Sequence, residues 1–212
     1  MEYNLLGYMG LAFGALAAAP PELGLPRSPA LGGGPHDGVL LLYAALGVCL
    51  MPAYLALHLP SSPVTPASAP LLSAESKRHV LWLSGLFSVD AFGGGMVANS
   101  LVAYWLELKF HPSPFLLGSI FFLSSLAAGG SLLLALPVAK RLGLVRTMVF
   151  THLPSSLLLA LVPFVPSLLA ASSVWVARAS LSQMDVPTRQ SFVQALVAPG
   201  ERTAAAGYTT AA

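Results

Sequence analysis

Residues 80–106 of this chain of 212 amino acids read VLWLSGLFSVDAFGGGMVANSLVAYWL. These 27 residues carry a single charged side chain, Asp90. An α-helix rises about 1.5 Å per residue, so about 20 residues cover the roughly 30 Å of hydrocarbon in a bilayer. The stretch is therefore long and apolar enough to cross a membrane as a helix, and the rest of the chain repeats its character.

Five further stretches are similarly apolar, and they cover residues 3–19, 39–57, 114–136, 147–165 and 167–184. Only two of the eighteen charged residues in the chain, Asp90 and Arg178, lie within the six stretches. Charged residues make up 8% of the chain, against about 25% in an ordinary soluble domain. We therefore predict an all-α membrane protein, a polytopic bundle of about six transmembrane helices.

The connections between the predicted helices alternate between the two sides of the membrane, and the basic residues are divided unequally between these two sets of connections. Seven Lys and Arg residues fall in one set and two in the other, which places residues 58–79 in the cytoplasm and residues 20–38 outside. We expect the end of an N-terminal helical half at 1–58, a cytoplasmic Pro- and Ser-rich linker at 59–79, and a truncated C-terminal helical half at 80–212. The expected location is the plasma (inner) membrane, with several membrane passes.

Composition also excludes several kinds of partner. The net charge is +2, which provides no basic field for nucleic acid. The single cysteine, Cys49, cannot form an internal disulfide, and the sequence has no Cys/His pattern typical of a zinc site. We expect no metal, no cofactor and no nucleic-acid partner.

Asp90 is the first candidate functional residue. It lies about 15 Å along its predicted helix, near the middle of the bilayer, and is followed by Gly93, Gly94 and Gly95. A carboxylate at this depth needs a polar cavity or a partner, and three glycines weaken the helix beside it. Two interpretations remain: a substrate or proton site next to a helix kink, or a structural carboxylate bonded to a neighbouring helix.

Arg178 is the second candidate, near the middle of the sixth stretch. At helical spacing it shares a face with Ser182, Asp185 and Arg189. This polar face either lines a cavity or clamps two helices together. For Asp185 and Arg189 at the membrane surface we favour an ion pair that closes the inner end, with Pro187 bending the backbone between them.

The chain resembles the major facilitator superfamily, and particularly its bacterial efflux-like members. The resemblance lies in DAFGGG at 90–95 with the following Ser100, Leu101, Tyr104 and Trp105, in Arg141-x-Gly143 with Arg146, and in MDVPTRQ at 184–190 leading to PGERTAAAG at 199–207.

The resemblance implies that residues 3–212 form the fifth to tenth helices, and the start of the eleventh, of a twelve-helix transporter. The chain would then be a fragment. Arg141 and Gly143 match the central residues of the inner-loop signature of that family, whereas Leu136 and Lys140 depart from it. The resemblance also implies that the helices bearing Asp90 and Arg178 border the central cavity.

These features together predict a secondary transporter of small solutes that works by alternating access, is proton-coupled and is efflux-like. Its partners would be the lipid bilayer, a small-molecule substrate and protons. Asp90 would take up the proton, and Arg178 would be its partner or the contact for an anion. The alternatives are an intramembrane hydrolase that uses Ser131 and His152, and a membrane assembly protein that does not transport.

Overall fold

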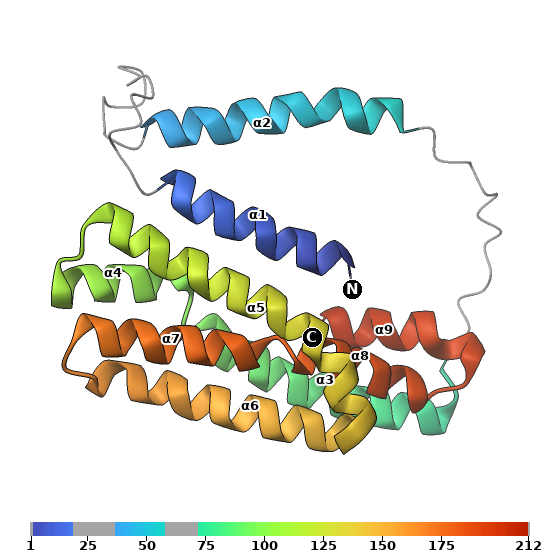
Figure 1. The fold of residues 1–212 in the computed structure, drawn as a ribbon. Coiled ribbons are helices and arrows are strands. Elements are labelled where there is room, and N and C mark those ends of the chain that lie inside the picture. Colours follow the sequence, from blue (N-terminus) through green and yellow to red (C-terminus); the bar gives the residue numbers. More distant parts are fainter. Residues whose placement is uncertain (1, 19–36, 58–71, 212) are drawn as a thin grey trace.

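The computed structural model describes residues 2–18, 37–57 and 72–211, and the secondary structure of these residues is helical, without a strand. The all-α prediction is thus confirmed. The helices are α1 (Glu2–Ala18), α2 (Asp37–Ala56), α3 (Ala74–Gly95), α4 (Asn99–Phe110), α5 (Pro114–Leu142), α6 (Leu144–Leu161), α7 (Leu168–Ser182), α8 (Asp185–Ala195) and α9 (Arg202–Ala211), with the 3-10 turns η2 (Val162–Phe164) and η3 (Pro199–Glu201) (Figure 1).

Four segments in the described part of the chain are long and apolar enough to cross a membrane. They are Asp37–Ala56, Ala74–Phe110, Pro114–Leu142 and Leu144–Phe164. The first and sixth predicted stretches form shorter helices, since α1 has 17 residues and α7 has 15. The structure therefore supports a multi-pass membrane protein, with fewer full-length spans in these residues than the six predicted.

The 27-residue apolar stretch at 80–106 is divided between two helices. Helix α3 ends at Gly95 and α4 begins at Asn99. The interruption directly follows the three glycines, each of which weakens a helix by about 1 kcal/mol relative to alanine. Asp90 therefore lies in the last turns of α3, close to a helix end.

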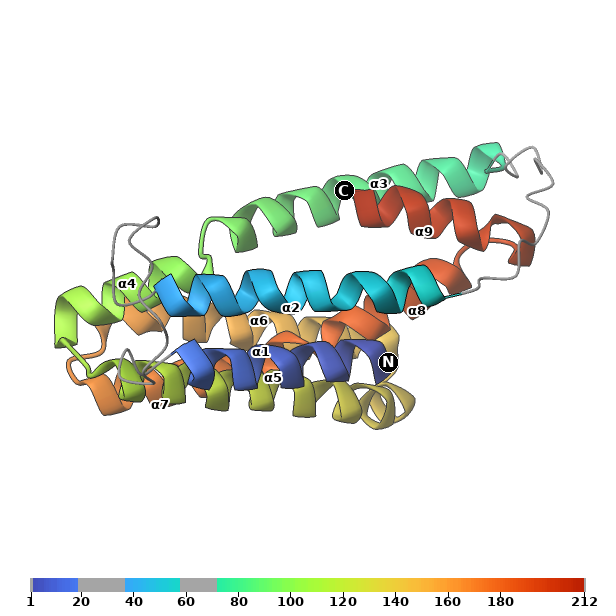
Figure 2. The same ribbon diagram turned by 90° about the horizontal axis from the view of Figure 1, so that it is seen from above.

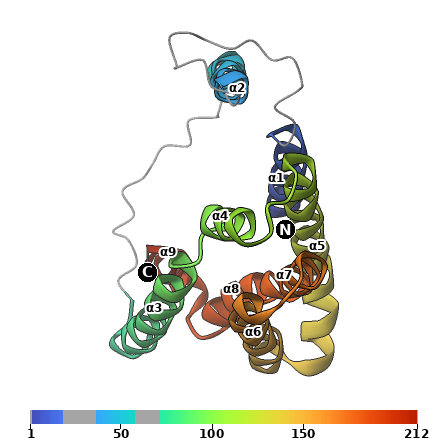
Figure 3. The same cartoon turned by 90° about the vertical axis from the view of Figure 1, so that its left-hand side faces the viewer.

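Helix α5 packs against α1 on one side and against α7 on the other (Figures 1 and 3). A Cβ atom added to Gly129 of α5 would lie 3.1 Å from Cβ of Tyr8 in α1. The glycine thus allows the two helices to approach closely, as small residues do where membrane helices meet.

A hydrophobic core joins α4, α5, α7 and the end of α6. Trp175 is buried there, and its ring meets that of Phe121 edge to face at 6.3 Å between centroids. Lys109 of α4 donates from Nζ to the carbonyl oxygens of Pro163 and Val165, at 3.0 Å each. These bonds satisfy carbonyls beyond the end of α6 and hold α4 against it.

Helices α3 and α9 lie side by side, apart from α5 and α7 (Figure 2), and α2 stands apart from the other helices (Figures 1 and 3). At the start of α3 the backbone N–H of Ser73 donates to Glu201 at 2.6 Å. Hydrogen bonds from the Ser76 side chain and from Ser73 lower the pKa of Glu201. Of the predicted linker at 59–79, residues 59–71 lie outside the described residues, and Ala74 already begins α3.

Candidate functional site

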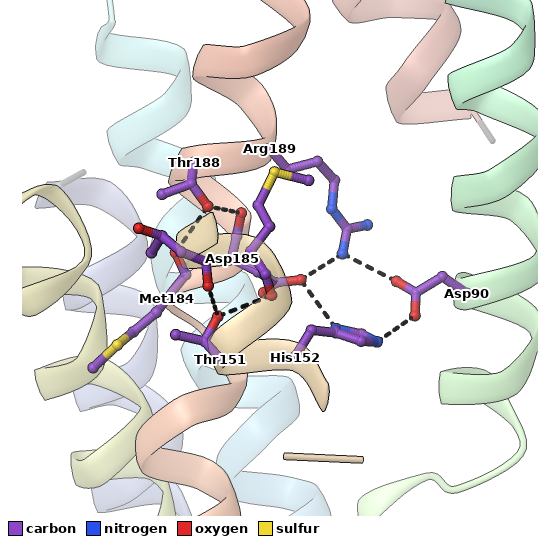
Figure 4. A network of polar contacts seen from close by, with 9 residues as sticks. Asp90, Thr151, His152, Met184, Asp185, Thr188 and Arg189 are labelled. Carbon is purple, nitrogen blue, oxygen red and sulfur yellow. Dashed lines mark hydrogen bonds and ion pairs between the residues drawn. The ribbon is translucent and has the colours of Figure 1, made fainter. Parts of the chain in front are cut away.

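Four ionisable side chains from three helices form a closed ring, which we call the charge ring: Asp90, His152, Asp185 and Arg189 (Figure 4). Nη2 of Arg189 lies 3.0 Å from Oδ2 of Asp90 and 2.6 Å from Oδ2 of Asp185. The imidazole of His152 lies on the other side, with Nε2 3.0 Å from Asp90 and Nδ1 3.3 Å from Asp185. The ring thus joins α3 to α6 and α8.

The local sequence of α8 accounts for the positions of two of the four residues in the ring. Asp185 and Arg189 are four residues apart in α8, so their side chains meet on one face of the helix. Asp185 also lies in the first turn of α8, where the helix dipole favours a negative charge. Pro187 lies in that same first turn, where proline breaks no hydrogen bond. It therefore does not bend the helix between the two residues, contrary to the sequence-based expectation.

His152 lies between the two carboxylates of the ring. A neutral imidazole has one N–H donor and one acceptor nitrogen, whereas an imidazolium has two donors. Both ring nitrogens of His152 face carboxylate oxygens, of Asp90 and Asp185. Two ionised carboxylates can be satisfied in this geometry only when His152 is protonated. In that state the four charges of the ring would sum to zero.

The ring lines a cavity of about 580 Å³ between α3, α6, α7 and α8. Asp90 and His152 each lie within two residues of the midpoint of their candidate span. Ionisable residues at such depth usually mark a substrate or ion path. A second cavity of about 640 Å³ lies between α1, α5 and α7, with contributions from α2 and α4.

Arg178 lies on the wall that the two cavities share, together with Ser182 and Gln183. Its guanidinium stacks on Trp175, with Cζ 4.9 Å from the ring centroid. Its Nε is shielded from solvent without an acceptor. In the described part of the chain, Arg178 has neither a hydrogen bond nor an ion pair through its side chain.

The structure thus gives Asp90 a different partner from the one that the sequence suggested. Arg178 lines the same cavity as Asp90, but the carboxylate is paired with Arg189, 99 positions later in the chain, and with His152. Sequence reasoning considered His152 only for hydrolysis. A single histidine in the middle of an apolar stretch was the signal that could have identified it.

The two residues of the hydrolase alternative are engaged separately. Ser131 is buried, and its hydroxyl donates to the carbonyl of Ala128 at 2.7 Å. His152 faces the two carboxylates of the charge ring. No hydrogen bond joins Ser131 to His152 among the residues that the structure describes.

The predicted loop contacts lie at the ends of helices. Arg141 is exposed in the last turn of α5, and Gly143 connects α5 to α6 with φ 87° and ψ 156°. That backbone conformation is accessible almost exclusively to glycine. Gly93 and Gly94 line the cavity beside Asp90, in the last turn of α3.

The chain is similar to an uncharacterised membrane protein of Saccharomyces cerevisiae, with 26% identity over 137 residues. This match covers 64% of the chain and 31% of the yeast protein, so the chain spans about a third of that relative. No family model matches the sequence. No solved structure matches it either. The match and the four candidate spans together support a helical, multi-pass membrane protein.

Proposed function

We propose that the chain is part of a secondary transporter of small solutes, of the major facilitator type, that works by alternating access. One observation carries the proposal: a closed ring of ionisable residues lies on a cavity between candidate membrane-spanning helices, near the midpoints of two of them. Placing four ionisable groups there costs several kcal/mol unless they pair. Transporters place their substrate and coupling-ion sites at this depth.

The number of donors that His152 can provide supports proton coupling. With the proton bound, the ring is neutral and both imidazole nitrogens donate to carboxylates. Loss of the proton leaves one net negative charge and turns one of the two contacts into a repulsion between lone pairs. The remaining ionisable groups that face His152 are Arg189, on α8, and Arg178, across the cavity on α7. Imidazole is the side chain that changes charge near neutral pH.

The ring also connects helices that come from separate parts of the chain. Helix α3 packs along α9, whereas α6 packs against α7 and α8 (Figure 2). Because the ring connects α3 to α6 and α8, its protonation would favour the closed arrangement and its deprotonation an open one. A change of this kind is what alternating access requires.

The test is flux in proteoliposomes that contain the full-length protein. An imposed pH gradient should drive saturable solute flux, accompanied by proton movement detected with a pH-sensitive dye. His152→Gln and Asp90→Asn should abolish the proton movement, because each removes a group that holds the proton. The matched control is His79→Gln, since His79 is an exposed histidine on α3.

Two outcomes would contradict the proposal. Flux that is equal with and without a pH gradient would exclude proton coupling, and the absence of flux for any solute would exclude a transporter. We also propose efflux through the plasma (inner) membrane. Localisation of a fluorescent fusion and the direction of flux in inverted vesicles check these two statements.

A further inference from the structure

We infer that Arg178 binds an anionic group of the solute, a carboxylate or a phosphate, within the two cavities. The inference rests on the proposed transporter function and names the class of its substrate. It begins from a difference in charge pairing. Among the described residues that line the two cavities, Asp90, Asp185, Arg189 and His152 pair with one another in the charge ring.

Arg178 has no counter-charge in that set, although it lines both cavities. A guanidinium in a membrane bundle cannot lose its proton, and leaving it without an anion is costly. The two carboxylates of the cavity are already occupied by Arg189 and His152. The described residues therefore provide no anion for Arg178, and we assign this role to a molecule that enters the cavity.

The surroundings of Arg178 provide further donors. Nε of Arg178 and Nε1 of Trp175 are both buried without an acceptor. Trp175 belongs to the hydrophobic core, so the ring on which the guanidinium stacks is held in place. Gln183 adds an amide on the wall that the two cavities share. Several donors with no acceptor fit a group rich in oxygen lone pairs, and a carboxylate or phosphate can take two parallel bonds from a guanidinium.

The size of the cavities agrees with a small solute. They measure about 640 and 580 Å³, within the roughly 300–1,000 Å³ typical of small-molecule sites. Because Arg178, Ser182 and Gln183 line both, an anion bound there would lie next to the charge ring. Its negative charge would then act on the ionisable groups of the ring across the same cavity.

The experiment measures binding rather than flux. The full-length protein in phosphatidylcholine nanodiscs is heated with benzoate, phenyl phosphate or the uncharged isostere benzamide. Benzoate or phenyl phosphate should raise the melting temperature in a saturable way, whereas benzamide should not. Arg178→Gln should weaken the apparent affinity by at least about tenfold, as expected for loss of a charge-assisted pair. Arg178→Lys, which keeps the charge but loses the planar fork, should retain part of the binding.

Arg146→Gln is the matched control, because Arg146 is exposed at the start of α6 and should leave anion binding unchanged. Four results would overturn the inference: no stabilisation by either anion, equal stabilisation by benzamide, equal affinity in Arg178→Gln, or stabilisation only by phosphatidylglycerol nanodiscs, which would assign Arg178 to a lipid headgroup. Arg178→Lys keeps the test informative if Arg178→Gln does not fold.

Failure of this inference can be distinguished from failure of the proposed function. Proton-driven flux of a neutral or cationic solute, without anion binding, would support the transporter function and contradict the anion site. Saturable anion binding that depends on Arg178, without flux of any solute, would support the anion site and contradict the transporter function.

Discussion

Arg178 and Arg189 are eleven positions apart, line the same cavity and each stack on an aromatic ring. Arg178 lies over Trp175 at 4.9 Å and Arg189 over Phe87 at 4.7 Å. Nε of each is buried without an acceptor. They differ in their terminal nitrogens, because Nη2 of Arg189 contacts two carboxylates, whereas the described residues offer no carboxylate to Arg178.

This difference separates two uses of a cation inside a membrane bundle. A guanidinium with its counter-ions present contributes to holding helices together, and removing it leaves charges unpaired. A guanidinium without them is held by packing and is available to a ligand. Stacking on an aromatic ring is common to both and therefore does not indicate which use applies.

The largest effect should come from removing the paired arginine. Arg189→Gln leaves Asp90 and Asp185 with His152 as their one remaining ring partner, and because the contacts of Arg189 are partly buried, we expect a cost of about 1–3 kcal/mol. The full-length protein should therefore lose that much free energy of unfolding in mixed-micelle denaturation. The exposed Arg146→Gln should change it by less than about 0.5 kcal/mol.

A second substitution checks that the loss is electrostatic. Adding Asp185→Asn to Arg189→Gln removes one of the stranded charges, so part of the stability should return. If the double variant is as unstable as the sum of the two single variants, the contact between Asp185 and Arg189 contributes nothing measurable to the free energy of unfolding.

A pair of double-mutant cycles compares the two arginines directly. Asp90→Asn with Arg189→Gln should give a coupling energy of about 0.5–3 kcal/mol, as expected for residues in one network. Asp90→Asn with Arg178→Gln should be additive within about 0.5 kcal/mol. A larger coupling with Arg178 than with Arg189 would restore the pairing that the sequence suggested and would contradict the charge ring.

The smallest effect should come from removing the unpaired arginine. Arg178→Gln should change the free energy of unfolding by less than about 1 kcal/mol, or increase it, because the folded state no longer carries a charge without a counter-ion. The same denaturation measurement, made without added anions, provides the value. A loss comparable to that of Arg189→Gln would mean that Arg178 clamps helices instead of binding a ligand.

The sequence predicted the fold class because spanning a bilayer is a requirement on composition. Each run of about 20 apolar residues can be recognised without knowing its neighbours. Helix lengths were less accessible. The glycines at 93–95 indicated a weak point beside Asp90, but the end of α3 at Gly95, the start of α4 at Asn99 and the 15 residues of α7 were seen only in the structure.

The candidate site was predictable in part for the same reason. Asp90 and Arg178 stood out because a charge is rare at the middle of an apolar stretch, and the contact of Asp185 with Arg189 follows from a spacing of four within one helix. Those inferences need only local information along one helix.

Only the tertiary structure decided which partner each charge has. Asp90 meets Arg189 and His152 because α3, α6 and α8 converge at one cavity, and no local pattern encodes that meeting. Which of the described residues has no charged partner, here Arg178, also depends on the tertiary structure. Charge pairing in a low-dielectric interior acts between side chains that are close in space, whereas the sequence specifies depth along each helix and not which helices face one another.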